Sequence, residues 1–211
     1  MSSVKSVQTV KEVLHTNIRD SIMAKQALMN DDAVADCFQN AVQAIVARYR
    51  QGGRLYVAGN GGSAADAQHI VAEFVSKLAR DRRPLPAEAL TVDTSIITAI
   101  GNDYGYDQLF ARQLRGKATQ KDVFLGITTS GQSPNILLAL DECKALNIPS
   151  IVFAGRDGGP CADKADYCVI APGHRTSTIQ ELHIILGHTL CEVVEHELCF
   201  KEAMQQELAD A

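Results

Sequence analysis

His69 and Glu73 are the first two residues in the chain whose types and spacing are suited to chemistry. On a helix, residues four apart lie on the same face. An imidazole and a carboxylate held together there can exchange protons with a substrate or bind a metal ion. A solvated ion pair is the ordinary alternative, but the residues around this pair are mostly apolar.

A second group of such residues, Gln180, Glu181, His183 and His188, lies in the C-terminal segment. On one straight helix Gln180 and His188 would be about 12 Å apart along the axis. A shared metal ion would therefore require an irregular start to the helix or a site that spans two subunits. A buried structural histidine is the alternative for His183 and for His188.

The stretch from Leu55 to Ala58 predicts a short buried strand, and Gly59-Asn60-Gly61-Gly62-Ser63 follows it as a turn into an Ala-rich helix. A strand, a glycine turn and a helix point backbone N–H groups at an anion. The G-x-G-x-x-G pattern of dinucleotide sites is absent. A simple tight turn is the alternative.

The loop at 128–133 carries four hydroxyl side chains around a glycine, from Thr128, Thr129, Ser130 and Ser133. Hydroxyls and N–H groups at the start of a helix suit a phosphate group. An ordinary helix cap would need Ser133 alone. The G-x-x-x-x-G-K sequence of a P-loop is absent.

Strands and helices that alternate along the chain must position these residues. We expect two helices within 7–50 that break at 30–32, and further helices at 64–78, 95–100, 107–115, 135–146 and about 178–208. Strands are expected at 55–58, 89–92, 122–128, 150–155 and 167–171. This alternation predicts an α/β fold with one parallel sheet. The loops at Asn60, Asn102, Thr128 and Asp157 would then line one crevice at the carboxyl ends of the strands.

Composition narrows the class of protein. The chain has 211 residues, which suits a single unit made of N-terminal helices (1–52) packed on an α/β domain (53–211). A net charge of −5 without a basic run argues against nucleic acid or an anionic membrane as partner. The six cysteines form no C-x-x-C pair, and the polar first twenty residues do not form a signal peptide. We expect free thiols and a cytoplasmic protein.

Five motifs, in this order, resemble the sugar isomerase (SIS) fold and, within it, the phosphoheptose isomerases. They are G-N-G-G-S-A-A-D-A-Q-H-x-x-x-E at 59–73, G-N-D-Y-G at 101–105, T-T-S-G-Q-S at 128–133, D-G-G at 157–159 and I-Q-E-L-H-x-x-x-x-H at 179–188. The resemblance covers most of the chain. It implies a five-stranded parallel sheet between helices, and a homotetramer with active sites at subunit interfaces.

The resemblance also implies an activity, conversion of sedoheptulose 7-phosphate to D-glycero-D-manno-heptose 7-phosphate, the first step of ADP- or GDP-heptose biosynthesis. The implied acid/base pair is Glu73 and His188. The implied ligands of one Zn²⁺ per subunit are His69, Glu73, Gln180 and His188. The implied sugar-phosphate contacts are Asn60, Gly61, Gly62, Ser63, Glu73, Asn102, Asp103, Thr128, Thr129, Ser130, Ser133 and Gln180. A carboxylate that ligates zinc is a weaker base, so the two implied roles of Glu73 compete.

The chain departs from the family pattern at two positions. Thr128 stands where the family usually has Ser, and Thr178 stands where the family commonly has Arg. Arg175 is a candidate to supply the missing charge.

Two other functions remain open at this stage. SIS proteins that bind the replication initiator DnaA look similar but lack the acid/base positions, whereas Glu73 and His188 are both present here. A sugar-phosphate-sensing regulator ranks last, because no separate DNA-binding segment is recognisable.

Overall fold

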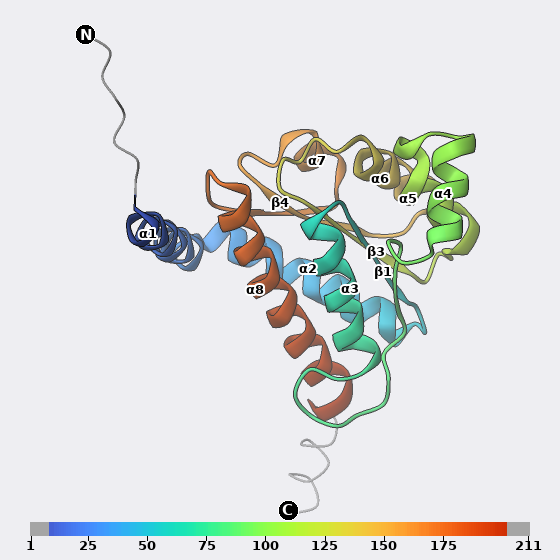
Figure 1. Ribbon diagram of the computed structural model, residues 1–211. Helices are drawn as coiled ribbons and strands as arrows, with labels where there is room; N and C mark the ends of the chain where they lie inside the picture. Colours follow the sequence, from blue (N-terminus) through green and yellow to red (C-terminus); the bar gives the residue numbers. More distant parts are fainter. Residues whose placement is uncertain (1–8, 202–211) are drawn as a thin grey trace, which may run out of the picture.

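Five parallel strands form the central sheet in the computed structural model, which describes residues 9–201 (Figure 1). The strands are β1 (Leu55–Gly59), β2 (Ala87–Ala89), β3 (Val123–Thr128), β4 (Ser150–Gly155) and β5 (Tyr167–Ala171). Their order across the sheet is β2-β1-β3-β4-β5. The chain therefore leaves β1 toward one edge and then returns to the other side of β1, which makes β1 and β3 the point where the winding direction changes.

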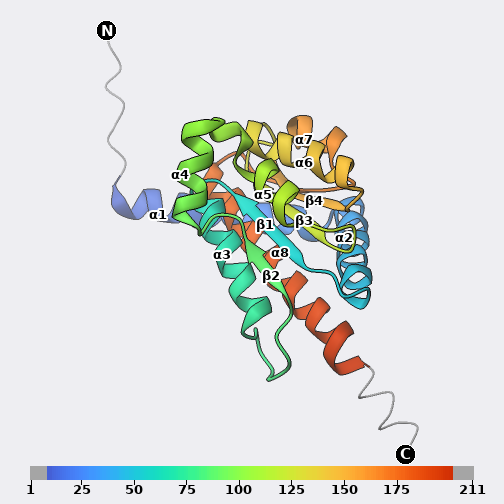
Figure 2. The same ribbon diagram turned by 90° about the vertical axis from the view of Figure 1, so that its right-hand side faces the viewer.

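Helices cover both faces of the sheet (Figures 1 and 2). One face carries α2 (Asp32–Arg50), α3 (Gly62–Val75) and α8 (Thr176–Glu195). The other face carries α5 (Leu109–Lys117), α6 (Pro134–Leu146), α7 (Gly159–Lys164) and the neighbouring α4 (Thr94–Asp103). The remaining elements are α1 (Val10–Met29), the 3₁₀ turn η1 (Tyr106–Gln108) and the π-helical turn η2 (His196–Phe200).

The core has two halves because strand side chains alternate between the faces of the sheet. Leu55 and Val57 pack beneath α2, α3 and α8, whereas Tyr56 and Ala58 pack beneath α5 and α6. Strands β1, β3 and β4 are buried along their whole length, as expected for a parallel sheet covered on both faces. The sheet is thus a rigid platform for the loops at its edge.

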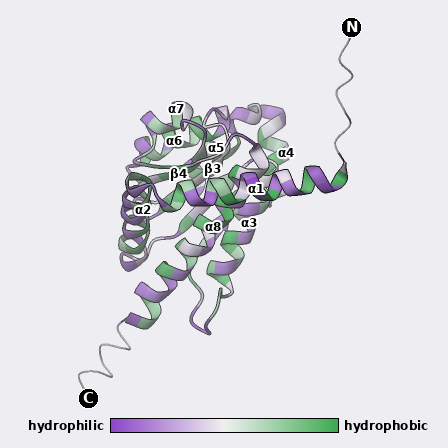
Figure 3. Ribbon diagram, turned by 90° about the vertical axis from the view of Figure 1, so that its left-hand side faces the viewer, coloured by the Kyte–Doolittle hydropathy of each residue, from purple (hydrophilic) through white to green (hydrophobic). Residues whose placement is uncertain are grey.

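Helix α1 makes a side-chain connection to α8. The Ser21 hydroxyl donates a hydrogen bond to the Glu181 carboxylate, and Lys25 pairs with the same carboxylate at 3.4 Å. The N-terminal part of α1 extends past the rest of the described chain, and green hydrophobic residues alternate with purple hydrophilic ones along it (Figure 3). Val10, Leu14 and Ile18 are each at least half exposed.

The structure confirms the α/β class, the five parallel strands and the N-terminal helical pair. Asp31 caps α2 at the expected break, since its carboxylate accepts a hydrogen bond from the Val34 backbone N–H at 3.0 Å. The expected end of the last helix at about residue 208 lies outside the described residues.

Three expectations about elements were wrong. The second strand is residues 87–89 and not 89–92, because Leu90 already turns away while it bonds to Val57. Helix α7 was not among the expected helices, because its Gly159-Pro160 start carries residues that usually break a helix. Asn102 does not lie in a loop that follows a strand. Helix α4 continues through it to Asp103, started by the Asp93 carboxylate as cap.

None of the helices in residues 9–201 is both long and apolar enough to cross a bilayer.

Candidate active site

The carboxyl ends of β1 and β3 lie side by side, and the glycine turn and the hydroxyl loop follow them directly. Gly59 pairs with Ile127 across the two strands. Ligands of open α/β sheets bind at such a change of winding direction. The two loops that the sequence singled out as anion sites are therefore neighbours.

Asn60 connects the two loops through its side-chain amide. It exchanges two hydrogen bonds with the amide of Asn135, each 2.9 Å long, and Asn135 lies in the first turn of α6. The Tyr106 hydroxyl donates a third bond to Asn60 Oδ1, also 2.9 Å long. Asn135 is 1% exposed, so the link is buried at its base. This link holds the N-termini of α3 and α6 together at the same edge of the sheet, where the positive ends of both helix dipoles face the crevice.

The hydroxyl loop has a defined internal geometry. The Thr128 and Ser133 hydroxyls lie 3.1 Å apart, and Ser130 Oγ accepts a hydrogen bond from the Gln132 backbone N–H at 3.2 Å. Ser133 occupies the N-cap position of α6, yet its side chain caps no backbone N–H. Pro134 has no N–H, and the N–H groups of Ile136 and Leu137 donate to the Ser133 carbonyl at 3.0 Å, so Asn135 supplies the backbone N–H of this turn that the unused cap leaves for an anion.

Gly131 fixes the position of this loop. Its φ of +66° is in the left-handed region, and a Cβ there would overlap the backbone carbonyl of Gly158. Gly159 approaches the same loop from the other side. The 157–159 turn, which the sequence placed near the site, therefore packs against the hydroxyl loop.

The imidazoles of His69 and His188 meet between α3 and α8. Their Nε2 atoms are 3.0 Å apart and their ring centroids 5.1 Å apart. Glu73 Oε1 lies 3.4 Å from His69 Nε2. His69 is therefore the common neighbour of the carboxylate on its own helix and of the imidazole on α8.

Helices α3 and α8 lie side by side and run in the same direction (Figures 1 and 2). Their contacts proceed in step: Gly62 meets Gln180, Ile70 meets Gly187 and His69 meets His188. A Cβ at Gly187 would lie 2.8 Å from Ile70 Cδ1. The absence of a side chain at this position lets the two helices approach closely enough for the rings to touch.

Asp66 adds a carboxylate one turn before His69. Burial raises its pKa, and the nearby His69 opposes the rise. Its Oδ2 atom is buried without a hydrogen-bond partner in the described residues. The polar face of α3 that carries His69 and Glu73 thus begins at Asp66.

The donor chemistry of this cluster suits zinc, because imidazole nitrogen and carboxylate oxygen are both common zinc ligands. Two ligands on a tetrahedral zinc ion lie about 3.3 Å apart, close to the His69–His188 and His69–Glu73 separations. Within residues 9–201, no three His, Cys, Asp or Glu side chains already form a metal-holding group.

Gln180 lies at the start of the site. Its side-chain amide occupies the space where a Cβ of Gly62 would be. It therefore lies over the first turn of α3, next to the glycine turn. In the part of the chain described here, no hydrogen bond joins it to His69 or His188.

His183 has a structural position. It is fully buried, and its Nε2 donates a hydrogen bond to the Ala154 carbonyl at 2.9 Å. Burial lowers its pKa to about 4, and the bond to Ala154 opposes this shift. The alternative proposed for a histidine in this segment thus holds for His183, whereas His188 lies at the α3–α8 contact.

Three other predicted positions lie apart from this cluster. Asn102 and Asp103 are exposed on α4 and bond to each other at 2.7 Å. Arg175 points to α1, where it bonds to Asn17 and pairs with Asp20 at 3.9 Å. In the described chain it therefore does not bring its charge to the histidine pair.

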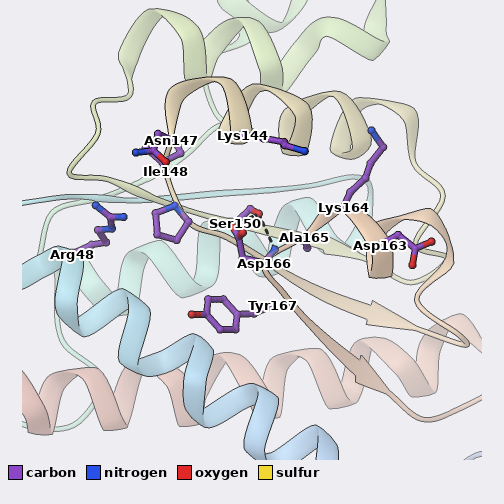
Figure 4. Close-up of a pocket in the computed structure, with 11 residues that line it drawn as sticks. Arg48, Lys144, Asn147, Ile148, Ser150, Asp163, Lys164, Ala165, Asp166 and Tyr167 are labelled. Carbon is purple, nitrogen blue, oxygen red and sulfur yellow. Dashed lines mark hydrogen bonds between the residues drawn. The ribbon is translucent and has the colours of Figure 1, made fainter.

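The cavity drawn in Figure 4 lies at the opposite end of the sheet. It has a volume of 470 Å³, and its lining includes Arg48, Lys144, Ser150, Lys164 and Tyr167. Ser150 and Tyr167 begin β4 and β5, so the cavity is at the amino ends of the strands. The candidate site, by contrast, is open: 48% of the His69 side chain and 21% of the Glu73 side chain are exposed.

Three residues of the site were missed by sequence reasoning: Asp66, Tyr106 and Asn135. Each belongs to a motif or borders one, since Asp66 is part of S-A-A-D, Tyr106 follows G-N-D-Y-G and Asn135 follows the hydroxyl loop. Asp66 also has helical spacing to His69, whereas the spacing of Tyr106 and Asn135 relates them to no other polar residue of the site. Only the folded chain brings Tyr106 and Asn135 to Asn60.

Comparison with known proteins identifies the family of the chain. Residues 21–155 match the SIS domain family. The chain is 46% identical over 192 residues to phosphoheptose isomerase 2 of Campylobacter jejuni, covering 91% of this chain and 96% of that protein. It is 44% identical over 189 residues to the phosphoheptose isomerase of Clostridium acetobutylicum, covering 90% and 96%.

Solved structures give the same result. The structure of phosphoheptose isomerase GmhA from Neisseria gonorrhoeae matches with a TM-score of 0.83 and 37% identity, over 89% of this chain and 99% of that one. A phosphoheptose isomerase from Francisella tularensis matches with a TM-score of 0.85 and 35% identity, over 90% and 100%. The agreement of sequence, fold and site motifs over nearly the whole chain means that it belongs to the phosphoheptose isomerases, a family of SIS-domain enzymes.

Proposed function

We propose that the protein isomerises sedoheptulose 7-phosphate to D-glycero-D-manno-heptose 7-phosphate in heptose biosynthesis. The observation that carries the proposal is the junction of two loops for an anion with one acid/base cluster. The Asn60–Asn135 link joins the loops, and α3 runs directly from the glycine turn to His69 and Glu73. An enzyme that acts on a phosphorylated sugar needs an anion site and an acid/base group no farther apart than the length of the sugar.

The chemistry moves one proton between neighbouring carbons through an enediol. It requires a base for the carbon-bound proton and an acid for the oxygen. We assign the base to Glu73 on α3 and the acid to His188 on α8. His69 lies within 3.4 Å of the Glu73 carboxylate and within 3.0 Å of the His188 ring. The phosphate, bound at residues 128–133, fixes the register of the sugar far from the reacting carbons.

We propose further that one Zn²⁺ per subunit binds at this cluster. His69, Glu73 and His188 would hold it, with Gln180 as the fourth family ligand. When bound, zinc supplies a Lewis acid that stabilises negative charge on the substrate oxygen. The separations from His69 Nε2 to His188 and to Glu73 support this proposal.

We propose a homotetramer with active sites at subunit interfaces. Two observations support it: an apolar stripe on α1 is exposed, and the His69–Glu73 surface is open in the single chain. We also place the protein in the cytoplasm. Every cysteine lies within the described residues and is a free thiol, as expected in a reducing compartment.

The test is turnover of sedoheptulose 7-phosphate by the purified protein, with and without a chelator. Turnover that falls on chelation and returns with Zn²⁺ supports both the reaction and the metal. Turnover that resists chelation removes zinc from the proposal and leaves the reaction. An absence of turnover in zinc-supplemented protein contradicts the proposed function and favours the rival, a non-catalytic SIS protein that binds the initiator DnaA.

A further inference from the structure

Arg82 makes a dense set of hydrogen bonds at the C-terminal end of α3. Its Nη2 donates to the Glu73 carbonyl at 2.7 Å, and its Nη1 donates to the Phe74 carbonyl at 2.8 Å and to the Ser76 and Arg83 carbonyls at 3.1 Å. These carbonyls include groups that a helix end leaves without a partner. The guanidinium therefore caps the helix that carries His69 and Glu73.

Glu195 holds this guanidinium from α8. Arg82 Nε donates to Glu195 Oε2 at 2.9 Å, and the two side chains are only 3% and 5% exposed. The same carboxylate also accepts from the backbone N–H groups of Leu78 and Arg80, both at 3.4 Å. A buried ion pair is retained only where its polar atoms are satisfied, and here both partners bond in several directions.

The pair lies at a defined level of the α3–α8 contact. Glu195 is two helical turns after His188, on the same face of α8. Glu73 is one turn after His69 on α3. The parallel helices thus touch first at Gly62 and Gln180, then at the two histidines, and finally through Arg82 and Glu195.

We propose that Arg82 and Glu195 are positioning residues for the isomerase site: together they set the height and rotation of Glu73 relative to His188. The inference rests on the proposed function for its kinetic part. Neither residue touches the substrate, because both side chains are buried below the cluster. Their effect is transmitted through the Glu73 backbone, to which Arg82 bonds directly.

The contact between α3 and α8 depends on the planar, forked shape of the arginine guanidinium. One guanidinium reaches α3 carbonyls with its two terminal nitrogens while Nε faces Glu195. A lysine keeps the charge but offers one nitrogen in place of three, so it can reach only one side of the contact. Arg82→Lys therefore separates the charge of the residue from its geometry.

The experiment compares Arg82→Lys with Arg115→Lys, a control for the same substitution at another arginine–glutamate pair, although the Arg115 side chain is 61% exposed and that of Arg82 is 3% exposed. Arg115 also pairs with a glutamate, Glu142, through Nε at 3.1 Å, but it joins α5 to α6 on the opposite face of the sheet. We expect kcat for sedoheptulose 7-phosphate to fall about 10-fold or more in Arg82→Lys, the scale of a misplaced catalytic group. KM should change less than about threefold, because the phosphate loop is on other elements. Arg115→Lys should leave kcat and KM within about twofold of the wild-type values.

A second readout does not depend on turnover. In protein labelled with ¹⁵N-histidine, the imidazole resonances of His69 and His188 should move in Arg82→Lys and stay in place in Arg115→Lys. If the wild-type protein fails to turn over the sugar, the proposed function fails and these resonances alone decide the positioning role. Unmoved resonances in a folded Arg82→Lys protein overturn the inference.

Glu195→Gln covers the case in which Arg82→Lys does not fold. The amide keeps one oxygen that accepts from Arg82 and removes the charge. We expect the same pattern at smaller size, a lower kcat with an unchanged KM. Two outcomes would show that the pair stabilises only the fold. In one, folded Glu195→Gln and Arg82→Lys keep the wild-type kcat. In the other, the loss of kcat equals the fraction of unfolded protein measured by circular dichroism.

Discussion

Asn60 and Asn135 exchange two amide hydrogen bonds of 2.9 Å each and so hold the ends of β1 and β3 in one fixed geometry. Each amide uses one donor and one acceptor in the pair. Asn60 is only partly buried and keeps one N–H for a ligand, whereas Asn135 is 1% exposed and holds Asn60 from below. The pair is thus both a brace for the two loops and a part of the surface that an anion meets.

Changing Asn135 tests whether an anion binds beside this pair. Asn135→Ala removes both bonds and should raise KM for sedoheptulose 7-phosphate several-fold. Asn135→Asp keeps the shape and one bond but adds a negative charge, so it should raise KM further by like-charge repulsion. Steady-state kinetics of both variants decides the point. Equal KM values in the two variants mean that no anion lies there.

Removing two hydroxyls tests the phosphate loop. The double variant Ser130→Ala, Ser133→Ala should raise KM about 10-fold or more, the scale of lost hydrogen bonds to a charged group, and leave kcat nearly unchanged. Thr98→Ala, which removes an exposed hydroxyl on α4, is the control. An unchanged KM in the folded double variant contradicts the assignment of the loop.

Glu73 and His188 carry the proposed proton transfers. Glu73→Gln keeps the size of the side chain but removes the base, so kcat should fall roughly 10²-fold or more. His188→Gln should lower kcat similarly and should lower zinc per chain, measured by mass spectrometry. His196→Gln, on the exposed surface beyond α8, should do neither. Wild-type kcat in Glu73→Gln would rule out the mechanism.

His183 predicts a pH dependence of stability. Its folded pKa of about 4 lies below the ordinary value of 6.5, because burial disfavours the charged ring. Between these values the unfolded chain binds the proton and the folded chain does not. Stability from this group is therefore fully present above pH 6.5 and is lost as the pH falls toward 4, by at most about 3 kcal/mol.

The variant His183→Gln isolates this effect, because its amide can still donate to the Ala154 carbonyl. The difference in unfolding free energy between wild type and variant should shrink as the pH falls from 7.5 to 4.5. Urea unfolding at three pH values measures it. Parallel pH dependences of the two proteins would contradict the assignment to His183.

The exposed stripe on α1 predicts assembly. At micromolar concentration we expect a homotetramer by sedimentation equilibrium. Leu14→Glu with Ile18→Glu should give smaller species, because buried charge in an apolar contact is costly. Arg19→Glu on the same helix is the control for a charge change outside the stripe. A wild-type monomer would end the proposal.

Much of the architecture could be read from local patterns. Apolar runs such as 122–128 and 150–155 predict the strands within a residue, because a fully buried strand needs continuous apolar side chains. The Asp31 cap and the break before α2 follow from local hydrogen bonding. The motifs also predicted the family, because their order and spacing, together with the acid/base positions Glu73 and His188, are specific to it.

The tertiary structure decided which of these residues meet. His69 and His188 are far apart in sequence, and their contact depends on Gly187 letting α8 approach Ile70 on α3. The same holds for Asn135 at Asn60 and for Arg82 between Glu73 and Glu195. Local sequence patterns reflect the free energy of a single helix or strand. These contacts depend instead on how two segments pack against each other, and that packing is determined only in the folded chain.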